Sequence, residues 1–89
     1  NEKIESVTSY SPTKSAYIQI GAFRKENVSK SIAEDISSKL GTTVEVVPTM
    51  VSDPVMYRIL VGPEHKDKII STIADLMELG ISDYFLTHG

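Results

Sequence analysis

Two stretches with an apolar residue at every third or fourth position constrain the fold of this chain more than any other feature. They span residues 28–40 and 66–79, and each is followed by a glycine, Gly41 and Gly80. This spacing is typical of amphipathic helices, and glycine commonly follows a helix because it adopts the left-handed conformation without strain. The sequence therefore predicts two helices, each with one apolar face.

Four further segments have the composition and alternation of β-strands, at residues 15–22, 42–47, 55–62 and 83–87. Gly62-Pro63 is expected to end the third of them, since both residues interrupt regular pairing. The resulting order is β-α-β-β-α-β. Short connections and right-handed crossovers then predict an α+β, ferredoxin-like (RNP-like) fold, a four-stranded antiparallel sheet with both helices on one face. The other face of the sheet is left open.

The first 14 residues are expected to be a linker or tail, with a single domain over residues 15–89. Ser, Thr and charged residues dominate this first segment, and its few apolar residues follow no helical or strand period. Because residue 1 is Asn1 rather than methionine, we expect the chain to be a fragment of a longer protein.

Composition excludes several classes of function. Nine Lys and Arg against twelve Asp and Glu give a net charge of −3, which disfavours duplex DNA as a partner. The absence of cysteine excludes disulfides, thiolate zinc sites and cysteine nucleophiles. No apolar run is long enough to predict a membrane span, so we expect no direct membrane insertion by this fragment.

Strand alternation predicts which side chains lie on the open face. Gln19 is polar within an apolar strand, and the guanidinium of Arg58 is unsuited to a core, so both are placed outward. By the same reasoning Phe85 is expected to face the helices. The open face is then predicted to carry Tyr17, Gln19, Met56, Arg58, Leu60, Tyr84 and Leu86, a mixed aromatic and polar surface of the kind that binds ligands. Two simpler alternatives are open: Gln19 could be merely solvated, and Arg58 could pair with Glu45.

Two motifs resemble the signature of the SPOR domain, the sporulation-related repeat of bacterial envelope proteins. They are "YIQIGAFRKEN" at residues 17–27 and "YRILVGP" at residues 57–63. The first motif matches the family pattern, which is an aliphatic residue, Gln, an aliphatic residue, Gly, a small residue and Phe. The pattern containing Arg, two aliphatic residues, Gly and Pro falls on the second. "ELG" at residues 78–80 also fits, whereas Glu64 stands where the family commonly has an aromatic or aliphatic residue.

The resemblance implies a non-catalytic module that binds septal peptidoglycan, specifically GlcNAc-MurNAc strands denuded of their stem peptides. It also implies a location in the bacterial cell envelope, periplasmic or extracytoplasmic, at the division septum. No cofactor, metal or nucleic acid is expected. Together with the predicted open face, it gives as candidate glycan-binding residues Tyr17, Gln19, Gly21, Ala22, Phe23, Arg58, Leu60 and Tyr84. Phe23 has two possible roles, as a wall of the site or as a plug of the core.

Other classes of function have less support. His65, His88 and the scattered carboxylates form no recognisable catalytic or metal-binding motif, so we expect no catalysis by this fragment. An amidase or lytic transglycosylase module elsewhere in the parent protein is left open. RNA binding would need stacked aromatics on the central strands and a basic surround. The remaining alternative is a protein-protein interaction module of the bacterial envelope that uses the same sheet face.

Overall fold

The computed structural model describes residues 15–50 and 53–88 and contains four strands and two helices within them. Their order is β-α-β-β-α-β, as predicted. Their bounds are β1 (Ser15–Phe23), α2 (Glu26–Leu40), β2 (Val44–Pro48), β3 (Tyr57–His65), α3 (Lys66–Glu78) and β4 (Phe85–Thr87). The predicted tail at residues 1–14 lies outside the described residues.

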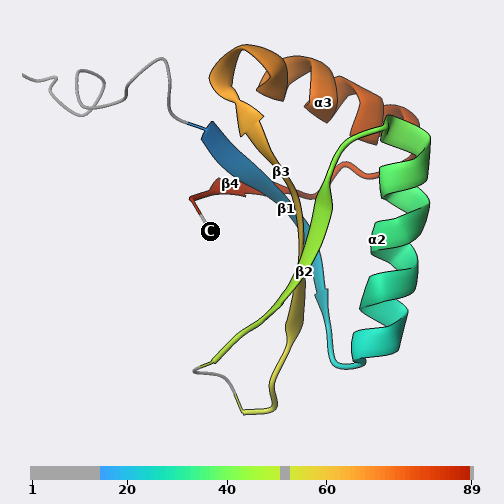
Figure 1. Ribbon diagram of the computed structural model, residues 1–89, viewed down its shortest axis with the longest axis vertical. Helices are drawn as coiled ribbons and strands as arrows, with labels where there is room; N and C mark the ends of the chain where they lie inside the picture. The colour runs from blue at the N-terminus through green and yellow to red at the C-terminus, as the bar shows by residue number, and fades with distance from the viewer. Residues whose placement is uncertain (1–14, 51–52, 89) are drawn as a thin grey trace, which may run out of the picture.

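All four strands form one antiparallel sheet in the order β2-β3-β1-β4. Helix α2 packs against β2 and β3, α3 packs against β1 and β3, and both cover the same face of the sheet (Figure 1). The predicted ferredoxin-like arrangement is therefore confirmed. Neither helix in the described ranges is long and apolar enough to cross a membrane.

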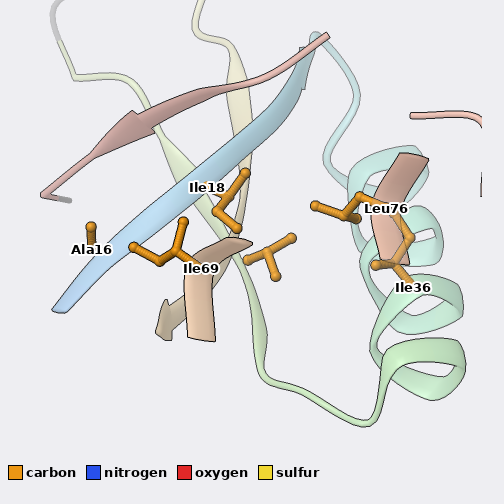
Figure 2. Close-up of a cluster of buried hydrophobic side chains, with 6 residues drawn as sticks. Ala16, Ile18, Ile36, Ile69 and Leu76 are labelled. Carbon is orange, nitrogen blue, oxygen red and sulfur yellow. The ribbon is translucent and has the colours of Figure 1, made fainter. Parts of the chain in front are cut away.

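The core lies between the covered sheet face and the two helices (Figure 2). Ile18 on β1 and Ile36 on α2 meet Ile69 and Leu76 on α3, and all four side chains are almost fully buried. Burying such aliphatic side chains contributes about 1.5–3 kcal/mol each and gives the small domain most of its stability. The predicted inward positions of the first strand and of α3 are thus confirmed at these residues.

The buried stripe of α2 is rotated relative to the predicted one. Its buried residues are Ser29, Ala33 and Ile36, whereas Val28 is exposed. Ser29 is fully buried but keeps a hydrogen-bond partner, because its hydroxyl donates to the carbonyl of Lys25 at 3.1 Å. Apolar spacing alone could not reveal that a serine, with its hydroxyl satisfied by the preceding turn, is the first buried residue of the stripe.

The prediction that Gly62-Pro63 ends the third strand is wrong, because β3 continues to His65. The pairing of Ala16 with Glu64 and of Ile18 with Val61 leaves two β3 residues, Gly62 and Pro63, opposite Tyr17. This bulge accommodates Gly62 and Pro63, and the pairing of β1 with β3 continues beyond them. Gly62 has φ +127°, and a Cβ there would lie 2.8 Å from the nitrogen of Glu64, so only glycine fits.

A second bulge interrupts β1 after Gln19. Gln19 pairs with Leu60 and Gly21 pairs with Ile59, so Ile20 is the extra residue. If the side chains of β1 alternated strictly, with Ile18 and Ile20 facing the helices, Ala22 would face the helices too. The bulge instead turns Ala22 to the open face, directly opposite Arg58.

The predicted facing of the last strand is also wrong by one residue. Phe85 pairs with Gln19 and Leu86 pairs with Ile18. Residues directly opposite each other share a face, so Phe85 lies on the open face and Leu86 on the helix side. Tyr84 precedes the strand rather than belonging to it. The expectation that an apolar aromatic faces the core fails here because β4 is a three-residue edge strand with little core to reach.

Candidate functional site

The open face is organised in rows of directly opposed residues across the sheet. One row contains Glu45, Leu60, Gln19 and Phe85, from β2 to β4. The next row contains Val47, Arg58 and Ala22. The structure therefore brings Gln19, Ala22, Arg58 and Leu60 of the predicted site onto one surface. The outward placement of Arg58 and Leu60 is confirmed by this register.

Leu60 is on the open face but is not accessible, with 1% of its surface exposed. Two polar pairs lie around it. The hydroxyl of Tyr17 donates to Oε2 of Glu45 at 3.4 Å, and Nη1 of Arg58 donates to Oε1 of Gln19 at 3.5 Å. Leu60 thus packs beneath the open face with almost no accessible surface, and its predicted contact with a glycan stays a prediction.

Arg58 has hydrogen-bonding capacity that the protein leaves unused. A guanidinium carries five N–H donors, and here the contact to Gln19 is at the long limit of a hydrogen bond. Its Nε is buried and has no partner in the described part of the chain. The alternative pairing of Arg58 with Glu45 is not seen among the described residues; Arg58 donates to Gln19, and Glu45 accepts from Tyr17. A buried donor without a partner costs free energy and commonly indicates a missing water or ligand.

Gly21 and Phe23 form a second local unit, at the end of β1. A Cβ on Gly21 would lie 3.1 Å from Cε2 of Phe23, so the aromatic ring covers the position where a side chain would be. Phe23 pairs with Tyr57, which shares the helix-side face with Ile59. Phe23 is 38% exposed, and this register places it on the opposite side of the sheet from Gln19 and Arg58. Both roles of Phe23, as a wall of the site or as a plug of the core, stay predictions.

A pocket of about 330 Å³ lies beside the end of β4 and is named here the β4 pocket. It is lined by residues 19–22 of β1 and by residues 83–85. It brings together four of the predicted site residues, Gln19, Gly21, Ala22 and Tyr84. It also includes Phe85, 58% exposed, which reasoning from the sequence had assigned to the core. The outward position of Phe85 could have been expected from the short segment after Gly80, because so few residues can form only an edge strand.

A larger pocket, of about 450 Å³, lies on the helix side between α2 and β2. Lys30, Glu34 and Val46 are among its lining residues, and none of the predicted site residues is. The open face and the β4 pocket are therefore the part of the described structure where the candidate residues gather.

Comparison with known families identifies the family of this chain. The model of the SPOR domain family matches residues 12–87 of the sequence. The chain belongs to the SPOR domain family. Among solved structures, the SPOR domain of RlpA from Pseudomonas aeruginosa is similar, with a TM-score of 0.73 and 17% sequence identity over 83% of this chain and 99% of that chain. At this identity, the likeness shows a shared fold. No curated protein sequence matches the chain.

SPOR domains are binding modules rather than enzymes, and they bind peptidoglycan. They occur in proteins of the bacterial envelope and of cell division. The unused donors of Arg58 and the exposed aromatic surface around Gln19 are compatible with a polar, carbohydrate-containing ligand.

Proposed function

We propose that this SPOR domain binds glycan strands denuded of their stem peptides, through the open face of its sheet. The observation that carries this proposal is the Arg58–Gln19 pair, which combines a long 3.5 Å contact with a buried Nε that has no partner among the described residues. A carboxylate or carbonyl oxygen of a ligand would satisfy this guanidinium far better than the Gln19 amide does.

A denuded GlcNAc-MurNAc strand offers the matching groups. Its lactyl carboxylates can accept hydrogen bonds from Arg58, and its acetamido and hydroxyl groups can pair with the amide of Gln19. Ala22, directly opposite Arg58, has a methyl side chain that leaves room for a sugar ring to approach. The rings of Tyr17 and Tyr84 provide apolar surface for pyranose faces, and their hydroxyls can serve as polar contacts.

Discrimination against intact peptidoglycan would come from the amide that joins the stem peptide to the lactyl group. That amide removes the carboxylate charge which Arg58 is placed to bind, and the peptide adds bulk above a shallow surface. Both effects favour strands from which amidases have removed the peptides. Because such strands arise at the division site, binding them would localise the parent protein to the septum.

The test is a pulldown on purified sacculi, with and without pre-treatment by an amidase that strips stem peptides. The domain is compared with Gln19→Ala, Arg58→Ala and a control, Lys39→Ala, which removes an exposed charge on α2. All variants are first checked for folding. We expect stripped walls to bind more wild-type domain. We also expect Arg58→Ala to weaken binding about tenfold or more, since hydrogen bonds to charged groups contribute about 1.5–3 kcal/mol.

A folded wild-type domain that binds neither kind of wall would refute the proposal. It would then favour the alternative, a protein-protein interaction module of the envelope that uses the same face. Equal binding to stripped and intact walls would retain peptidoglycan binding but overturn the denuded-strand specificity. Septal localisation is tested separately, by imaging fluorescent fusions of the wild type and Arg58→Ala in dividing cells.

A further inference from the structure

We propose that the β4 pocket is a subsite for an uncharged N-acetylated pyranose, held against Phe85 and hydrogen-bonded to Asp83. This inference rests on the proposed function and specifies which sugar of the alternating strand occupies which part of the face. Neither Asp83 nor Phe85 was among the residues that the sequence predicted for the site.

The first observation is the position of Phe85. Its ring lies on the open face, directly opposite Gln19, and is 58% exposed on an edge strand. A large exposed aromatic beside a polar amide provides a flat apolar surface together with a directional group. This combination suits the apolar face and the substituents of one sugar ring.

The second observation is the charge of the pocket. Asp83 is the only charged residue that lines the β4 pocket in the described structure. Its carboxylate makes no hydrogen bond or ion pair with any residue of the ranges 15–50 and 53–88. A free carboxylate accepts hydrogen bonds from sugar hydroxyls and from an acetamido N–H, and it repels another carboxylate. The pocket is therefore suited to a neutral sugar and unsuited to a lactyl group.

The third observation is the unpaired edge of β1. Strand β4 pairs with β1 only at Tyr17, Ile18 and Gln19, so no described strand pairs with β1 on this side beyond Gln19. The exposed backbone N–H and C=O groups of such an edge can hydrogen-bond an acetamido group, which contains the same amide unit. This edge forms one wall of the pocket.

Arg58 and Asp83 then lie on opposite sides of Ala22, which pairs with Arg58 and lines the pocket. The cation favours the sugar that carries a lactyl carboxylate, and the anion favours the sugar without one. An alternating strand would therefore bind in one register, with MurNAc at Arg58 and GlcNAc in the β4 pocket.

The test uses two defined ligands, a denuded GlcNAc-MurNAc tetrasaccharide and the neutral GlcNAc tetramer. Affinities are measured by calorimetry, and backbone amide shifts by NMR. The variants are Phe85→Ala and Asp83→Asn. The matched controls are Leu86→Ala, on the opposite face of β4, and Asp75→Asn, on α3. We expect Phe85→Ala to weaken tetrasaccharide binding about tenfold and Asp83→Asn about fivefold, with both controls within twofold of the wild type.

The neutral tetramer should shift the amides of Gly21, Ala22 and Phe85 in the wild type and in Arg58→Gln, but not in Phe85→Ala. If the tetrasaccharide binds and needs Arg58, yet Phe85→Ala and Asp83→Asn bind it as the wild type does, the pocket is not a subsite. The same conclusion follows if the neutral tetramer shifts none of these amides in the wild type. If the wild-type domain binds no denuded glycan, the proposed function itself fails.

Discussion

The hydroxyl of Tyr17 donates a hydrogen bond to the carboxylate of Glu45, although β3 separates their two strands. The pair therefore crosses β3 on the open face, where Leu60 lies directly opposite Glu45. Toward β1, Leu60 is flanked by the hydrogen-bonded side chains of Arg58 and Gln19. A sheet face that appears uncovered at the level of helices and strands is thus covered locally by its own polar side chains.

Leu60 should behave as a core residue despite its position on the open face. We expect Leu60→Ala to lower the free energy of unfolding by about 3 kcal/mol, within the range for large-to-small changes at buried sites. Leu60→Met, which nearly conserves volume, should cost less than about 1.5 kcal/mol and leave wall binding unchanged. Urea denaturation and the sacculus pulldown measure the two effects. A loss of binding in a fully stable Leu60→Met variant would indicate direct contact with the ligand.

Glu45 should oppose binding of an anionic strand, because its carboxylate lies on the same face as Arg58. We expect Glu45→Gln to strengthen binding to stripped walls about twofold at low ionic strength, with a smaller gain at physiological salt, where exposed charges are screened. Stability should change by less than about 1 kcal/mol, since the 3.4 Å bond to Tyr17 is long and only partly buried. Weaker binding by the folded Glu45→Gln variant would instead make this carboxylate a ligand contact.

Much of the fold could be predicted from the sequence, because the two helical periods and the strand alternation are long and regular. The outward placement of Gln19 and Arg58 followed from the cost of burying polar groups. The bulges in β1 and β3 could not be predicted in this way. Each inserts a residue that shifts every later side chain of its strand to the other face, and Ala22 reached the site through such a shift.

The facing of the residues in β4 could not be predicted from the sequence either. Three residues, Phe85 to Thr87, contain too little alternation to fix a register, so pairing with β1 decides which aromatic faces out. The burial of Leu60 was equally hidden, since its neighbours on the open face, Glu45 and Gln19, come from two other strands. The facing of residues on regular strands was thus predictable, and a facing set by tertiary pairing was not.

Gly62 should be required for folding rather than for ligand contact. Its φ of +127° and the 2.8 Å approach of the Glu64 nitrogen exclude a Cβ. We expect Gly62→Ala to lower the free energy of unfolding by about 3 kcal/mol or more. The control is Gly41→Ala, at φ +68° with no atom near its Cβ, which should cost only about 1 kcal/mol. Equal costs for the two variants, measured by urea denaturation, would contradict this explanation.

Gly21 should tolerate a side chain once the ring of Phe23 is removed. The ring stands 3.1 Å from the position of a Cβ, and it is partly exposed and able to move. We expect Gly21→Ala to cost about 1 kcal/mol, at the lower end of overpacking effects, and less in the background of Phe23→Leu. A double-mutant cycle measures this coupling. Additive costs would show that the loss of stability in Gly21→Ala does not come from contact with the Phe23 ring.

The carboxylate of Glu64 should depend on Thr42 for its stability in the fold. Glu64 is 9% exposed, and its Oε2 accepts a 2.7 Å hydrogen bond from Oγ1 of Thr42. We expect Thr42→Val, which keeps the side-chain shape, to cost about 1–3 kcal/mol, because it leaves a buried charged acceptor without its donor. The double variant Thr42→Val with Glu64→Leu should recover most of that loss, since replacing both partners of a buried pair by apolar groups is nearly neutral.

Urea denaturation of the two single variants and the double variant measures the coupling between Thr42 and Glu64. A Thr42→Val variant as stable as the wild type would mean that water satisfies the carboxylate. A double variant less stable than both single variants would mean that Glu64 has a structural role beyond this hydrogen bond.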